Sequence, residues 1–125
     1  MNALVSAVAA ALLACSSADA APSTIHVTMT YLERFGLPRG TRYSATLLEL
    51  RDDESVELST AVRATEGEQP PLRLTLEYEP QAVHPRSRYR IDATIEFRTE
   101  VLFRGSASLA DPLPDAVRLT MRRVP

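Results

Sequence analysis

Lysine and tryptophan are absent from the 125 residues, and cysteine occurs once, at position 15. One cysteine and two histidines cannot form an internal disulfide framework or a Cys/His zinc site. No G-x-x-x-x-G-K-S/T loop and no G-x-G-x-x-G turn occurs, so the usual phosphate cradles of nucleotide-binding enzymes are missing. We therefore expect no metal, no cofactor and no small-molecule substrate.

The chain also has no large excess of positive or negative charge. The net charge is -2, so no cationic field attracts phosphate, and nucleic acid is not an expected partner. Hydrophobic residues make up 45% of the chain and charged residues 24%, which is the composition of a packed globular domain rather than a disordered tail.

The amino-terminal segment is apolar and uncharged. The run from Leu4 to Ala14 is too short to cross a bilayer, because a spanning helix needs about 20 apolar residues, but it fits the apolar region of a signal peptide. Leu12-Leu13-Ala14-Cys15 resembles the bacterial lipobox, in which the cysteine is acylated after cleavage. The alternatives are a plain signal that is cleaved near Ala20-Ala21, or a buried helix.

The chain thus divides into three predicted parts. Residues 1–14 form a lipoprotein signal peptide, residues 15–23 an acylated cysteine and flexible tether, and residues 24–125 a folded domain. In lipoproteins of this kind an aspartate after the cysteine commonly marks inner-membrane retention, and here Ser16 takes that place. The resemblance implies a lipid-anchored protein on the periplasmic face of the outer membrane.

Beyond Ser23 the hydrophobic pattern has a period of two, which indicates half-buried strands. Seven strands are expected, over residues 24–31, 43–50, 56–64, 72–78, 89–97, 101–108 and 117–124. The two prolines of residues 79–85 predict a crossing loop with one helical turn. Seven short strands without an amphipathic helix favour an all-β fold, an antiparallel β-sandwich.

Polar candidates for a catalytic or metal site are weak. His26 lies on the polar side of its strand and His84 precedes a proline, and neither has a serine or cysteine nucleophile at a recognisable spacing. Asp52-Asp53-Glu54 lacks calcium-loop spacing and is typical of a solvated turn. Arg88 and Arg90 are two positions apart, so a strand would place both on the same face of the sheet. That face is expected to be hydrated, and the alternative is a contact with a partner. No catalytic residue is predicted, and we do not expect an enzyme.

Two strands carry apolar residues on both faces. Leu47 is followed by Leu48, and Leu102 lies between Val101 and Phe103. Leu48 and Leu102 are therefore predicted to contact a partner from an exposed apolar strip. The competing interpretation is a β-bulge, or a cover by the loop of residues 80–85.

Several short segments together carry a family resemblance. They are Tyr31-Leu32-Glu33-Arg34-Phe35-Gly36-Leu37-Pro38, Leu50-Arg51-Asp52, Leu76-Glu77-Tyr78-Glu79-Pro80, His84-Pro85-Arg86-Ser87-Arg88-Tyr89-Arg90-Ile91 and Ala93-Thr94-Ile95. In this order they resemble the YscW/YbaY family of small bacterial envelope lipoproteins, and among these the type III secretion pilotins of the YscW and ExsB type. Physically they indicate structure: Pro38 fixes a turn, Asp52 bonds nearby amides, and the Tyr89 phenol caps a loop.

The resemblance implies a function. A pilotin is a chaperone that binds the carboxy-terminal segment of a secretin subunit and aids its outer-membrane targeting and ring assembly. Its partners are then that segment and the outer membrane, through the lipid on Cys15. The alternative is a general envelope lipoprotein of the YbaY type with a structural or stabilising role. A third class, an enzyme acting on envelope polymers, lacks any acid/base or nucleophile constellation.

Overall fold

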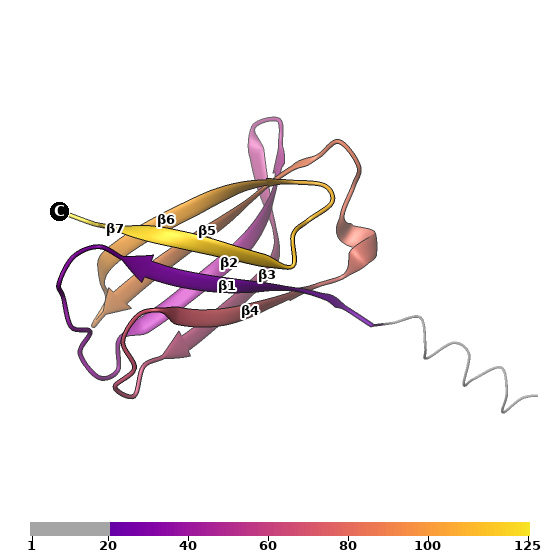
Figure 1. The fold of residues 1–125 in the computed structure, drawn as a ribbon. Coiled ribbons are helices and arrows are strands. Elements are labelled where there is room, and N and C mark those ends of the chain that lie inside the picture. The colour runs from indigo at the N-terminus through magenta and orange to yellow at the C-terminus, as the bar shows by residue number, and fades with distance from the viewer. Residues whose placement is uncertain (1–20) are drawn as a thin grey trace, which may run out of the picture.

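The computed structural model describes residues 21–125, and the predicted signal peptide, Cys15 and most of the tether lie outside them. Seven strands follow one another with a single 3-10 turn (Figure 1). They are β1 (Ser23–Tyr31), β2 (Arg42–Arg51), β3 (Glu54–Ala64), β4 (Leu72–Tyr78), η1 (Pro80–Ala82), β5 (Arg88–Phe97), β6 (Glu100–Ala110) and β7 (Ala116–Arg123). Within residues 21–125 no helix has the length and apolar character needed to span a bilayer.

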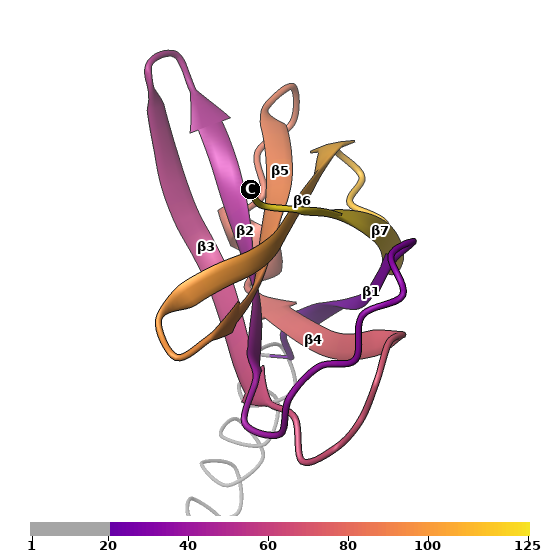
Figure 2. The same cartoon turned by 90° about the vertical axis from the view of Figure 1, so that its left-hand side faces the viewer.

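The all-β prediction and the strand positions are confirmed, including the helical turn in the β4–β5 loop. The strands form one sheet in the order β3-β2-β5-β6-β7-β1-β4. This sheet curls until its two halves face each other as the layers of a sandwich do, and its outline approaches a barrel (Figure 2). One pair departs from the antiparallel expectation, because β1 and β7 run parallel.

Alternating side chains of the strands fill the space between the two halves. On β1 and β4, Ile25 lies opposite Leu76 and Val27 opposite Leu74, and all four side chains are buried. The other core residues are Met29, Leu37, Tyr43, Ala45, Leu47, Leu72, Tyr89, Ile91, Ala93, Ile95, Leu102, Phe103, Val117, Leu119 and Met121. The two-residue period of the sequence is therefore the period of the core.

Two register shifts interrupt this alternation. Ile95 lies opposite Phe103 and Glu96 opposite Val101, so Leu102 is an extra residue of β6. On β3 the extra residue is Leu58, because Leu47 and Leu48 of β2 lie opposite Ser59 and Glu57. A β-bulge of this kind turns consecutive side chains toward the same side of a sheet.

The sheet turns its corner between β6 and β7. Their pairing is limited to Phe103 with Arg123 and Arg104 with Arg122. A Cβ atom added to Gly105 would lie 2.6 Å from Sδ of Met121, so glycine is needed where the two strands cross closely.

The turn after β1 is held by aromatic contacts. The rings of Tyr31 and Phe103 stack with centroids 4.1 Å apart, and Phe35 meets Phe103 edge-on at 5.9 Å. The Tyr31 hydroxyl donates a hydrogen bond to the carbonyl of Phe35. The carbonyl of Pro38 accepts a hydrogen bond from Thr41 Oγ1 at 2.6 Å, in agreement with the predicted turn. The first family segment thus closes one end of the core.

Candidate functional site

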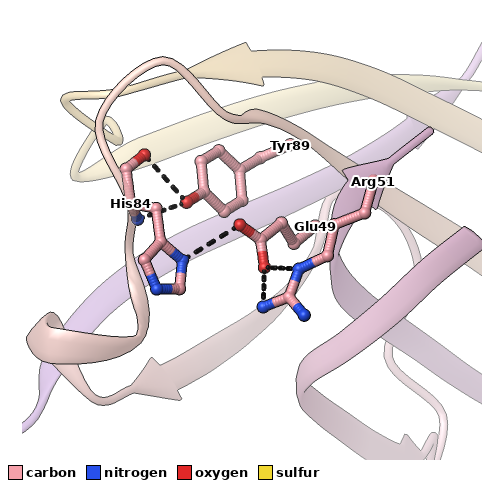
Figure 3. A network of polar contacts seen from close by, with 4 residues as sticks. All are labelled: Glu49, Arg51, His84 and Tyr89. Carbon is pink, nitrogen blue, oxygen red and sulfur yellow. Dashed lines mark hydrogen bonds and ion pairs between the residues drawn. The ribbon is translucent and has the colours of Figure 1, made fainter.

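A buried carboxylate organises one end of the sheet (Figure 3). Glu49 follows Tyr43, Ala45 and Leu47 on the core-facing side of β2, and its side chain is only 1% exposed. Its Oε1 accepts hydrogen bonds from Nε and Nη2 of Arg51, at 2.8 and 2.7 Å. Both nitrogens belong to the exposed Arg51 side chain at the end of β2, so the negative charge of the buried carboxylate is paired with a positive charge at the edge of the core.

The β4–β5 loop, residues 79–87, closes over this carboxylate. Oε2 of Glu49 lies 3.1 Å from Nδ1 of His84. The amide of His84 donates to the Tyr89 hydroxyl at 2.7 Å, and this hydroxyl lies 3.3 Å from the carbonyl oxygen of the same histidine. The Tyr89 phenol therefore caps the loop, as the sequence predicted.

The environment of Glu49 sets its charge. Burial raises the pKa of this carboxyl, but hydrogen bonds from Ser87, Arg51 and His84, together with the charge of Arg51, outweigh burial. The net pKa lies below its ordinary value. Glu49 is therefore an anion at neutral pH.

This network links β2 to the β4–β5 loop through the Glu49 carboxylate. Glu49 contacts Arg51 through one carboxylate oxygen and His84 through the other. Within residues 21–125 no group of three His, Cys, Asp or Glu side chains is placed to hold a metal ion. His26 is exposed, and its Nδ1 lies 3.2 Å from Oγ1 of Thr75 on the neighbouring strand β4.

Glu49 was missed by the motif search. Its position in the strand could have identified it, because the alternation of buried residues that begins at Tyr43 places residue 49 on the core-facing side of β2. The acids of the β2–β3 turn, Asp52 and Asp53, lie exposed in a hairpin where Asp52 has a φ of 44°. Within the described part of the chain the Asp52 side chain makes no hydrogen bond, so the predicted amide contact is not formed.

The two predicted partner-binding leucines have different surroundings. Leu48 is half-buried on the outer face of β2, opposite Arg90 of β5 and Glu57 of β3. Arg90 lies 2.7 Å from Asp92 on the same face. Leu48 thus forms a partly exposed apolar spot among charged side chains.

Leu102 is only 8% exposed, so the expectation of an exposed side chain at this position is wrong. The register shift between β5 and β6 is the reason, because it turns Leu102 inward beside Phe103. The β-bulge that the sequence left open as an alternative is the correct interpretation here. Leu102 belongs to the core and not to an accessible strip.

The fold and this end of the sheet define a small all-β domain with a packed core, a clamped loop and partly apolar outer strands. Comparison with known proteins identifies the family to which this domain belongs. The family model described as Type III secretion system lipoprotein chaperone (YscW) matches residues 11–110. The chain belongs to this family.

A solved structure has the same fold. It is described as an alternative pilotin from the type II secretion system of Vibrio cholerae, and it superposes with a TM-score of 0.77. The two proteins are 24% identical, and the match covers 83% of this chain and 98% of the other. At this identity the likeness supports the fold, and no curated protein matches the chain.

Proposed function

We propose that the protein is a pilotin: an outer-membrane lipoprotein that binds the carboxy-terminal segment of a type III secretion secretin and aids its targeting and ring assembly. The family match over residues 11–110 is the observation that carries this proposal. That match begins inside the predicted signal peptide and includes Cys15, so it covers the predicted lipidation site and the folded domain as far as the end of β6.

Two parts of the chain divide the work. The folded domain captures the secretin segment, and the lipid on Cys15 carries the complex to the periplasmic face of the outer membrane. Several acyl chains on one residue anchor firmly, because each buried methylene contributes about 0.8 kcal/mol. No covalent chemistry on the client is needed.

Leu48 is the proposed apolar contact on the outer face of β2. Its half-buried side chain has surface left to lose on binding, which favours association. Leu102 has almost none, so it contributes through the stability of the domain.

The first experiment separates capture from transport. Secretin from the same organism is co-precipitated with the full-length chain, and secretin is located by membrane fractionation in wild-type and Cys15→Ser cells. We expect the variant to retain the secretin on precipitation and to leave it in the inner membrane. If the wild type precipitates no secretin, and rings assemble normally without the protein, the general envelope lipoprotein replaces the pilotin.

A second experiment locates the contact. Leu48→Gln should weaken secretin binding about tenfold, which corresponds to the loss of roughly 1.4 kcal/mol of apolar contact. Leu32→Gln is the matched control, because Leu32 is 87% exposed in a loop away from this face. Equal binding by both variants would remove Leu48 from the contact while leaving the pilotin proposal intact.

A further inference from the structure

The two strands at the corner of the sheet separate soon after they meet. Their only paired residues are Phe103 with Arg123 and Arg104 with Arg122, among the residues that the structure describes. Beyond this point residues 106–110 of β6 pair with β5 alone, and residues 116–121 of β7 pair with β1 alone. Each of these half-strands therefore has an edge without a ladder partner, and such an edge is a template for another strand.

A groove begins at the separation, where Ser106 and Thr120 line it, and it extends over β5 and the paired ends of β6 and β7. Its volume is about 890 Å³, and it lies on the outer side of β5, β6 and β7. Its lining residues are Asp92, Ala93, Thr94, Arg104, Gly105, Ser106, Thr120, Arg122, Arg123, Val124 and Pro125. Most of these side chains are polar, and three are arginines. The groove is therefore suited to a polar chain rather than to an apolar helix.

Its charge is positive. Arg104 and Arg122 lie directly opposite each other across the β6–β7 pair, both are exposed, and within residues 21–125 neither forms an ion pair. Like charges that face each other across two strands are destabilising, so this pair carries a cost that a bound anion would remove. Asp92 does not supply that anion, because Arg90 holds its carboxylate at 2.7 and 3.1 Å.

The third arginine is fixed in place. The guanidinium of Arg123 lies 4.5 Å from the ring centre of Phe35 and 5.6 Å from that of Phe103. A cation held over aromatic rings keeps its charge and loses freedom before any ligand arrives. Because Arg123 follows Arg122 directly on β7, its guanidinium lies on the aromatic side of the strand, and Arg104 and Arg122 supply the positive charge on the outer face.

We propose that this groove binds an extended acidic peptide segment, which adds as a strand to the open edge of β6 and places carboxylates between Arg104 and Arg122. The inference rests on the proposed function, because it assigns that segment to the client. Arginine forks and carboxylates form paired, charge-assisted hydrogen bonds. Backbone pairing along the strand edge supplies the rest of the affinity.

An anionic lipid headgroup is the competing ligand, and two observations favour the peptide. An unpaired strand edge offers a row of backbone donors and acceptors that a phosphate cannot use. The groove also lies near Tyr31 and Met121, at the end of β1 opposite to Ser23, where the chain enters from the tether. With a lipid on Cys15, the chain would enter the domain from the membrane at the Ser23 end of β1.

The test uses the full-length chain in a non-ionic detergent and two synthetic peptides. In one peptide glutamates alternate with valines, and in the other glutamines replace the glutamates. We expect the acidic peptide alone to bind, with an affinity that falls as salt is raised. Arg104→Gln and Arg122→Gln should each weaken binding about tenfold. Arg118→Gln, on the same strand face but outside the groove lining, should bind as the wild type does.

Strand addition is tested separately from charge. A strand directs alternate backbone amides toward opposite edges, so N-methylation of one alternate set should abolish binding and methylation of the other set should not. Equal effects of the two sets would overturn the strand. Equal affinities for the acidic and neutral peptides would overturn the acidic ligand, as would vesicles of anionic lipid displacing the peptide from the groove.

The client connects this test to the function. If the secretin binds the wild type but binds the double variant Arg104→Gln, Arg122→Gln equally well, the groove is not its site, although the pilotin proposal stands. If the secretin binds neither protein, the pilotin proposal itself fails. The double variant should remain folded, and it should unfold at a higher denaturant concentration because the opposed charges are gone.

Discussion

Glu49 and His84 lie 35 residues apart in the chain, yet Oε2 of the first is 3.1 Å from Nδ1 of the second. This contact joins the core-facing side of β2 to the β4–β5 loop. Arg51 completes the pairing on the other carboxylate oxygen. A single buried anion thus fixes a loop that covers one end of the core.

Glu49→Gln should lower the free energy of unfolding by roughly 1 to 3 kcal/mol, because it weakens charged hydrogen bonds to Arg51 and His84. The pKa of Glu49 is lowered in the folded state, whereas the unfolded carboxyl titrates near its ordinary value of about 4.3. The stabilisation is therefore complete above this pH, and it is lost as the pH falls toward the folded pKa. Urea unfolding at a series of pH values measures it.

The control for this experiment is Glu57→Gln, which changes an exposed carboxylate on β3. Its stability should match that of the wild type at neutral pH. Wild-type and Glu49→Gln curves that run parallel from pH 7 to pH 3 would contradict the role given to Glu49.

Leu102→Ala should cost about 2 to 5 kcal/mol, because Leu102 is buried beside Phe103 and its truncation leaves a cavity. Leu48→Ala should cost less, since Leu48 is half-buried on the outer face. Thermal unfolding of both variants makes the comparison. A Leu102 variant as stable as the wild type would place this side chain at the surface after all.

Gly105→Ala should be destabilising by about 1 to 3 kcal/mol, because the new methyl group meets Sδ of Met121 at 2.6 Å. The cost should shrink in a Met121→Ala background, where the sulfur is absent. A double-mutant cycle gives this coupling. Additive effects of the two substitutions would show that the strands do not cross as closely as described.

Tyr31→Phe should lower stability by roughly 0.5 to 1.5 kcal/mol through loss of the hydrogen bond to the Phe35 carbonyl. Burial raises the pKa of the Tyr31 phenol, as does the charge of Glu33, while Arg123 lowers it. Because the unfolded phenol ionises first, near pH 10, stability conferred by Tyr31 is lost as the pH rises through that range. Unfolding from pH 9 to 11 should show a flatter decline for Tyr31→Phe than for the wild type.

Strand positions were predictable from the sequence because each strand obeys the same simple rule. Where one side faces a core, apolar residues recur at every second position, and this is plain from Ile25 to Met29 and from Tyr89 to Ile95. The partners of each strand were not predictable in this way. The parallel pairing of β1 with β7 depends on contacts between residues about 90 positions apart, such as Val27 and Val117.

The candidate sites show the same division. The role of Tyr89 followed from a phenol at the end of a loop, and Glu49 could have been found from the parity of its strand. Whether Leu102 faces the core could not be predicted, because a β-bulge changes which alternate residues face inward and leaves no unambiguous signal in the sequence. Arg104 and Arg122 belong to strands whose register is set by the fold, so the sequence alone does not bring them together.

The place where β1 begins limits how far the domain can travel. Eight peptide steps separate Cys15 from Ser23, and a fully extended chain of that length reaches roughly 26 to 29 Å. If Cys15 is acylated, the domain is therefore confined to a thin layer next to the bilayer and diffuses in two dimensions. Clients that it captures are concentrated in that layer, and the encounter of one subunit with the next becomes a lateral search along the membrane.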